Sequence, residues 1–166
     1  MIQYGLPVDV EIGGRIYKFR KKADYRQILD IIQILNDDEL PLNEKYFNAV
    51  LYFYEEMPED IETAIKYLMW FIAGGNEEQE QEIEQKPTMS WEKDFDIIAS
   101  AINKNSAEDI RSVPYMHWWT FIGKYMEIGE SVFSTVVSIR DKLRKGEKLE
   151  KWEREFYMHN KNRVDL

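Results

Sequence analysis

Apolar and polar residues alternate near the start of the chain and then change to helical spacing. Val8, Val10 and Ile12 alternate with acidic residues, and a Gly-Gly pair follows them. Alternation of period two interrupted by two glycines is typical of a β-hairpin, because both turn residues can adopt positive φ. The sequence therefore predicts a short hairpin over about residues 7–20. A lone hairpin is only marginally stable, so we expect it to lie against helices.

Beyond the hairpin, apolar residues recur every three to four positions, which is the spacing of amphipathic helices. Capping residues, prolines and glycines mark the expected boundaries. Helices are expected to begin near Asp24, Asn43, Pro58, Ser90, Pro114 and Ser131, and a polar last one is anchored by Leu149, Trp152, Phe156 and Tyr157. The predicted fold is mainly α: a compact bundle of about six to seven helices over residues 24–160, with the N-terminal hairpin.

The chain length suits one domain covering residues 1–166. Within it, residues 75–89 are rich in glutamate and glutamine and almost free of apolar side chains. Such a segment buries too little surface to offset the entropy of ordering, which predicts an exposed, flexible acidic loop. An acidic patch for a partner is the alternative interpretation.

Charge is unevenly distributed along the chain, whose formal net charge is −9. Residues 1–26 hold six basic and three acidic groups, residues 140–166 hold nine and six, and the middle holds seven and twenty-two. An acidic body disfavours binding to nucleic acid. The basic ends either balance the acidic middle within one chain or contact another copy or partner. The candidate assembly contacts are Arg20, Lys21, Lys22, Arg140 and Arg144.

Residues that carry chemistry are few. There is no cysteine, and His117 and His159 do not form a metal-binding pair. Glu92 and Asp96 share a helix face, where a solvated pair is the expected arrangement and a metal site the alternative. We expect no catalytic residue, no metal and no cofactor. The most apolar run, Ala64–Ala73, is half the length of a membrane span, so no membrane contact is expected.

The stretch YMHWWTFIGKYMEIG, residues 115–129, is the most aromatic part of the chain. On a helix one broad stripe would form from Tyr115, Trp118, Trp119, Ile122, Tyr125 and Met126. One interpretation places these rings in the core, with His117 and the indole N–H groups bonded to carbonyls. The other is a partly exposed surface that receives a partner helix, with His117 as a pH-sensitive group at its rim.

Several segments resemble the bacteriophage Gp-fifteen family of tailed phages and prophages of Gram-positive bacteria. The N-terminal match is VEIGGRIYKFRKKADYRQILDI, a hairpin followed by a helix that begins with an aspartate. The middle match is SWEKDFDIIASAINKNSAEDI, an aromatic and acidic helix. The last is MHWWTFIGKYMEI with FSTVVSIRDKL, the histidine–tryptophan–tryptophan helix and the arginine-containing helix behind it.

The resemblance implies a tail-assembly role, because the family's genes typically lie beside the tape-measure gene. It implies a non-catalytic chaperone or adaptor that keeps the tape-measure protein soluble, acting in the host cytoplasm and absent from the virion. Other tail-assembly proteins and further copies of the chain are additional expected partners. The partner-binding or core residues are then His117, Trp118, Trp119, Tyr125 and Met126. A structural tail component is the alternative, and a small metal-dependent hydrolase is a second.

Overall fold

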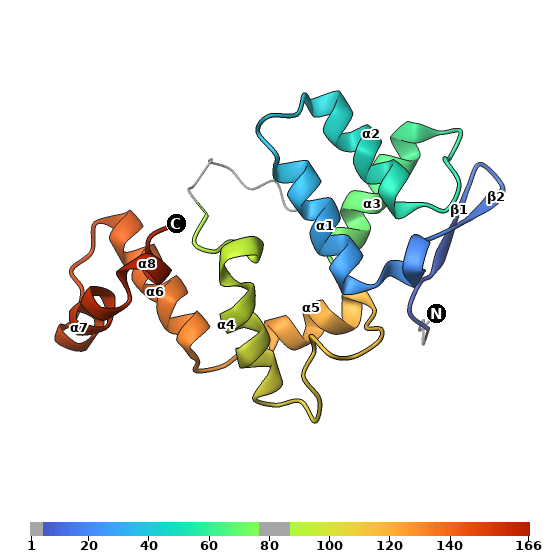
Figure 1. Ribbon diagram of the computed structural model, residues 1–166. Coiled ribbons are helices and arrows are strands. Elements are labelled where there is room, and N and C mark those ends of the chain that lie inside the picture. Colours follow the sequence, from blue (N-terminus) through green and yellow to red (C-terminus); the bar gives the residue numbers. More distant parts are fainter. Residues whose placement is uncertain (1–4, 77–86) are drawn as a thin grey trace. The chain divides into compact units, whose positions relative to one another are not determined.

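A computed structural model describes residues 5–76 and 87–166. The described chain is mainly helical with an N-terminal two-stranded hairpin, which confirms the predicted fold class (Figure 1). The elements are β1 (Asp9–Ile12), β2 (Arg15–Lys18), η1 (Arg20–Ala23), α1 (Tyr25–Asn36), α2 (Leu42–Phe53), α3 (Ile61–Ile72), α4 (Trp91–Asn103), α5 (Trp118–Met126), α6 (Val132–Lys145), α7 (Lys151–His159) and α8 (Lys161–Val164).

The chain divides into two compact units. Unit 1 comprises Met1–Glu80 and Pro114–Gly123, and unit 2 comprises Gln81–Val113 and Lys124–Leu166. Whether the whole chain folds as a single domain stays a prediction. The flexible acidic loop expected over residues 75–89 falls mainly on residues 77–86, which lie outside the described part of the chain.

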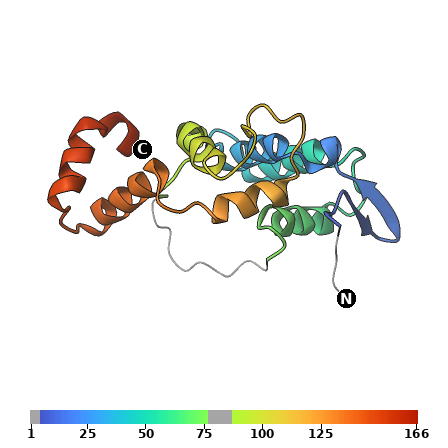
Figure 2. The ribbon, with the colours of Figure 1, turned by 90° about the horizontal axis from the view of Figure 1, so that it is seen from below.

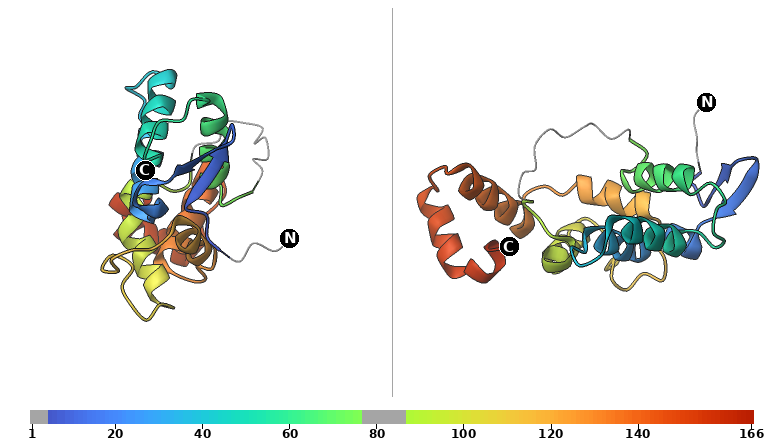
Figure 3. Two further views of the ribbon diagram at one scale, coloured as in Figure 1. Left: turned by 90° about the vertical axis from the view of Figure 1, so that its right-hand side faces the viewer. Right: turned by 90° about the horizontal axis from the view of Figure 1, so that it is seen from above.

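The hairpin forms where the alternating pattern predicts it. β1 and β2 pair antiparallel, and the turn residues Gly13 and Gly14 have φ of 60° and 81°. The sheet does not stand alone, because the backbone N–H of Glu55 donates to the carbonyl of Lys18 at 2.9 Å. Figure 3 shows the hairpin beside the helices of unit 1. The hairpin is thus tied to the residues that follow α2, as its marginal stability requires.

Unit 1 has a core built from α1, α2, α3 and the residue that follows the hairpin. Phe19 is 1% exposed, and its ring stacks on Phe53 with centroids 4.4 Å apart. Phe71 approaches the same ring edge-on at 5.2 Å. Helix α1 begins where predicted, because the Asp24 carboxylate accepts a hydrogen bond from the backbone N–H of Arg26 at 3.0 Å.

Two helix starts in unit 1 differ from the sequence-based prediction. Helix α2 begins at Leu42 after Pro41, one residue before the predicted cap Asn43. Helix α3 begins at Ile61, so Pro58 is not in its first turn. The cap of α3 is Asp60, whose carboxylate accepts from the backbone N–H of Thr63 at 3.0 Å; this bond sets the helix start later than proline alone suggested.

The aromatic helix α5 also starts later than predicted, at Trp118 instead of Pro114. The residues before it pair with the start of α1. The Met116 carbonyl accepts from the N–H of Tyr25 at 2.8 Å, and the Met116 N–H donates to the Asp24 carboxylate at 3.0 Å. Backbone groups engaged in this pairing are not available for helical bonds. The predicted stripe therefore loses Tyr115, which lies outside the helix.

Unit 2 contains α4, α6, α7 and α8. Figure 2 shows α6, α7 and α8, in orange to red, following one another with a turn of the chain between each. Ser90 caps α4 and Ser131 caps α6, both as predicted. The predicted anchoring of α7 is wrong for Trp152, which is 53% exposed, whereas Leu149, Phe156 and Tyr157 are half-buried and the charged Glu153 is buried. Helix α8 was not predicted, and its Val164 is 2% exposed.

Candidate partner-binding surface

His117 lies directly before α5 and is buried, with 2% of its surface exposed. Its Nδ1 accepts from the backbone N–H of Trp119 at 3.0 Å, so its proton sits on Nε2, which donates to the Pro7 carbonyl at 2.9 Å. Burial lowers the pKa of His117, and the bond to the Pro7 carbonyl opposes that shift. His117 is therefore a structural group inside unit 1 and not the rim of an open groove.

The lowered pKa of His117 predicts a pH-dependent stability. Because the unfolded chain binds a proton at this site more readily, the contribution of His117 to stability is fully present above the ordinary imidazole pKa of 6.5. It declines as the pH falls below that value towards the lower pKa of the folded protein. Urea unfolding at about pH 7.5 and 5.5 measures the difference. The His117→Gln variant should show a smaller pH dependence between those values. An equal change in unfolding free energy between the two pH values for both proteins would contradict this role of His117.

Trp118 fills the centre of unit 1. Its side chain is 1% exposed, its ring lies 5.6 Å from Phe121, and Phe121 stacks on Tyr25 at 4.5 Å. The indole Nε1–H donates to the carbonyl of Ile72 at 2.9 Å. The core interpretation, with indole N–H groups and His117 bonded to carbonyls, is confirmed for this part of the stretch.

Trp119 uses the same chemistry but stays partly exposed. Its Nε1–H donates to the carbonyl of Phe71 at 2.9 Å, next to the carbonyl that Trp118 uses. The Trp118 indole thus bonds a carbonyl in the last turn of α3, and the Phe71 carbonyl accepts from both the Trp119 indole and the backbone N–H of Gly74, the latter at 3.1 Å. The Trp119 ring contacts Trp70 at 5.5 Å, and Trp70 contacts Tyr67 at 5.1 Å. These three partly exposed rings, Tyr67, Trp70 and Trp119, form the aromatic triad.

The triad packs against the glycine that ends α3. Gly75 has φ of 83°, and a Cβ placed there would lie 3.0 Å from the Trp119 ring. The Gly75→Ala variant should therefore lose about 1–3 kcal/mol of unfolding free energy, because a left-handed conformation is strained for alanine. The matched control is Gly129→Ala, where the added Cβ meets nothing within 4 Å and φ is not positive. Thermal unfolding followed by circular dichroism tests this, and equal losses in both variants would contradict it.

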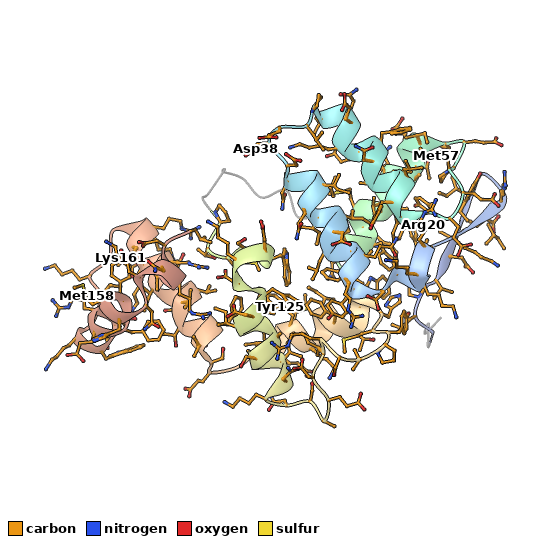
Figure 4. All side chains as sticks on the ribbon, viewed as in Figure 1. Arg20, Asp38, Met57, Tyr125, Met158 and Lys161 are labelled. Atoms are coloured by element: carbon orange, nitrogen blue, oxygen red, sulfur yellow. The ribbon has the colours of Figure 1, made fainter. Side chains whose placement is uncertain are left out.

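Tyr125 and Met126 belong to unit 2, because the chain divides between Gly123 and Lys124. The Tyr125 ring lies 4.9 Å from Trp91 and 5.7 Å from Phe133, and burial raises the pKa of its hydroxyl. Met126 is 67% exposed. Figure 4 labels Tyr125 on α5. The structure therefore does not gather the predicted residues in one place: the stripe is divided between the cores of two units and the surface.

The basic residues near the N-terminus lie on an unusual turn. Lys21 and Lys22 are exposed and adopt φ of 47° and 51°, a left-handed conformation that lysine rarely takes. Arg20 turns back onto the end of α2 and the residues after it, where its guanidinium donates to the carbonyls of Leu51 and Glu55, both at 3.2 Å. Lys21 and Lys22 are thus available to a partner, and Arg20 serves largely within unit 1.

Arg140 is not an exposed assembly contact, because it is 7% exposed and its guanidinium is held within unit 2. Its five N–H donors reach the Asp94 carboxylate twice, at 2.6 and 2.9 Å, and three backbone carbonyls. Those carbonyls belong to Thr88 at 3.1 Å, Arg163 at 2.6 Å and Val164 at 2.8 Å. The prediction of Arg140 as a surface contact is wrong, because Ile139 and Arg140 both lie on the buried side of α6. Arg144, one turn later, pairs with Asp141.

Sequence reasoning missed Asp94, which is 1% exposed. The signal was present, since Asp94 lies four residues before Ile98 and therefore on the same buried face of α4. The pair predicted from helical spacing, Glu92 and Asp96, is exposed, and Asp96 pairs with Arg163 at 2.9 Å. The carboxylate that organises unit 2 is thus the one between them.

Residues 5–76 and 87–166 contain no group of three histidine, cysteine, aspartate or glutamate side chains arranged to hold a metal ion. Over the same ranges no helix has the length and apolar character needed to cross a membrane.

The sequence comparison defines the class of the protein as a bacteriophage protein. A family model described as Bacteriophage Gp15 protein matches residues 2–166, and the chain belongs to that family. The resemblance inferred from the aromatic and arginine-containing segments is thereby confirmed. No curated protein and no solved structure matches the chain.

Proposed function

We propose that this phage protein is a non-catalytic tail-assembly chaperone or adaptor, which binds the tape-measure protein and keeps it soluble while the tail tube forms. Membership of the Bacteriophage Gp15 protein family over residues 2–166 carries the phage-related role. The gene order that the family resemblance implies, with these genes beside the tape-measure gene, supports the choice of partner. Binding would take place in the host cytoplasm, and the protein would be absent from the finished virion.

The aromatic triad is the surface we assign to this partner. Its rings are partly exposed, and the Trp119 indole is fixed by its bond to the Phe71 carbonyl at 2.9 Å. Rigid aromatic side chains provide contact area at a low cost in conformational entropy, which suits an apolar helix laid across them. The net charge of −9 helps to keep such a complex dispersed.

A non-catalytic role agrees with the hydrogen bonds of His117, the only buried histidine in the described residues. Both ring nitrogens of His117 are occupied, one by the Trp119 N–H and the other by the Pro7 carbonyl. A general base needs a free nitrogen that faces substrate. Asp94, the buried carboxylate of α4, is likewise held by Arg140 and by the backbone N–H of Ser90 at 2.9 Å.

Co-expression with the neighbouring tape-measure protein tests the proposal. We expect a soluble complex with several copies of this chain per client by size-exclusion chromatography with light scattering. Trp70→Ser removes the ring that contacts both other members of the triad and should reduce the recovered complex at least about tenfold, as for a central interface aromatic. The control is Ile16→Ser, a hairpin residue that is 64% exposed. An insoluble client beside free protein would contradict the proposal.

A structural tail component is the second candidate function. The two candidates differ in where the protein ends, because a chaperone leaves the assembled tail whereas a structural component remains. Mass spectrometry of purified virions separates them. We expect the tape-measure protein to be detected and this protein to be absent, and a fixed copy number per virion would favour the structural role.

A further inference from the structure

Helix α5 is shared between the two compact units of the chain. Unit 1 includes residues up to Gly123 and unit 2 resumes at Lys124, so the boundary lies inside the helix. The chain also passes between the units from Val113 to Pro114, in a segment that belongs to no helix or strand. Of these two described crossings, the one in α5 is therefore the one that runs through regular secondary structure.

The residues before Gly123 are fixed in the core of unit 1. Trp118 is 1% exposed, and its Nε1–H donates to the Ile72 carbonyl at 2.9 Å. Phe121, two residues before the glycine, is fully buried and stacks on Tyr25 with ring centroids 4.5 Å apart. The first half of α5 must therefore move together with unit 1.

The residues after the boundary are fixed in unit 2. The Lys124 ammonium donates to the Ser106 hydroxyl at 3.2 Å. The Tyr125 ring lies 4.9 Å from the Trp91 ring of α4 and 5.7 Å from the Phe133 ring of α6. The second half of α5 must therefore move together with unit 2, and a change in the relation of the two units has to be absorbed where the two halves meet.

The residue at that point is a glycine that the packing of α5 does not require. Gly123 is exposed, its φ is not positive, and a Cβ built on it would meet no described atom within 4 Å. Gly75 differs, because its φ is 83° and a Cβ there would press on Trp119. Glycine inside a helix has the greatest backbone freedom and weakens the helix relative to alanine. Gly123 thus makes α5 easiest to deform at the boundary between the units.

We propose that Gly123 is a hinge at which α5 bends, so that units 1 and 2 change their relative orientation while each keeps its own core. Hinges are a few positions that absorb large changes in φ and ψ, and small residues are common there. Buried rings and hydrogen bonds hold the helix on both sides of Gly123, which concentrates the bending at this residue. The proposal goes beyond the proposed function and requires no tape-measure protein, so its failure leaves the client test unchanged.

Pulsed electron paramagnetic resonance between two nitroxide labels on the full chain tests the proposal. The sequence contains no cysteine, so two introduced cysteines take the labels specifically. Glu44→Cys on α2 and Ser138→Cys on α6 replace exposed residues and report between the units. Glu44→Cys with Glu62→Cys, on α3, reports within unit 1. We expect a broad distribution of distances between the units and a narrow one within unit 1.

Gly123→Ala should narrow the distribution between the units. Alanine is more favourable than glycine inside a helix by about 0.8–1.0 kcal/mol, so bent conformations should become about four- to fivefold less populated. The matched control is Gly129→Ala, which follows α5 within unit 2, also has room for a Cβ and should leave the distribution unchanged. Circular dichroism checks that all labelled variants fold.

Two results would overturn the hinge. One is a single narrow distance between the units in the labelled protein that retains Gly123, because the units would then keep one orientation. The other is an equally broad distribution in Gly123→Ala and Gly129→Ala, because the motion would then arise outside α5.

Discussion

Replacing Arg140 with methionine is expected to destabilise the protein by about 3–5 kcal/mol, because it leaves the buried Asp94 carboxylate without its charged partner. The loss is large for two reasons. Asp94 is 1% exposed, so water cannot replace the guanidinium. The same guanidinium also holds the carbonyls of Arg163 and Val164, so removing it frees the end of the chain from unit 2.

Denaturant unfolding of the full chain measures this loss. The matched control is Arg144→Met, one turn along α6, where the exchanged arginine pairs with Asp141 near the surface; little change is expected there. The double variant Arg140→Met with Asp94→Leu should recover part of the loss, since an apolar pair avoids the cost of an uncompensated charge. A single Arg140→Met variant as stable as the control would contradict the role assigned to the pair.

Trp118→Ala is the second variant with a large expected effect, a loss of about 3–5 kcal/mol. Trp118 is 1% exposed and is among the largest fully buried side chains in the described residues. Truncation leaves a cavity beside Phe121 and removes the donor to the Ile72 carbonyl, which then lies at the end of α3 without that bond.

Two further variants make the Trp118 measurement specific. Trp118→Phe keeps an aromatic ring but no N–H, so its loss should fall between those of the unchanged protein and Trp118→Ala. Trp152→Ala removes a tryptophan that is 53% exposed and should change the unfolding free energy of dilute protein little. Similar losses for Trp118→Ala and Trp152→Ala would show that Trp118 is not the centre of the core.

The elements that could be predicted are those fixed by local chemistry. Two glycines with positive φ define the hairpin turn, and Ser90, Ser131 and Asp24 each cap the helix that the sequence assigned to them. Gly74 and Gly75 follow α3, both in the left-handed conformation that is typical of glycines at helix ends. In each case the residue acts on backbone groups within a few positions, so the sequence pattern contains the necessary information.

The features that escaped prediction depend on distant partners. The start of α5 is set by the pairing of Met116 with Tyr25 and Asp24, about ninety residues earlier in the chain, and helical spacing cannot reveal such a pairing. Arg140 looked like a surface charge because its partner, Asp94, lies 46 residues away. The exposure of Trp152 was missed because a tryptophan at helical spacing usually marks a buried side.

The candidate site was predicted in part. The stretch around Trp118 and Trp119 was compatible with a core position and with a partner-binding surface. In the structure its residues are divided between a core position and a partly exposed one. Trp118 is core, whereas Trp119 is partly exposed. The other two rings of the aromatic triad, Tyr67 and Trp70, come from α3, which no pattern in the sequence linked to the histidine–tryptophan–tryptophan segment.

Photo-crosslinking from the aromatic triad in cells producing the phage tests whether this surface binds the tape-measure protein. A benzophenone amino acid at Tyr67 keeps an aromatic ring on the partly exposed side of α3. The same group at Ile16, on the hairpin, is the control because that residue is 64% exposed and outside the triad. We expect an adduct between this chain and the tape-measure protein from position 67 and none from position 16. Adducts from position 67 with other proteins alone, or none at all, would contradict it.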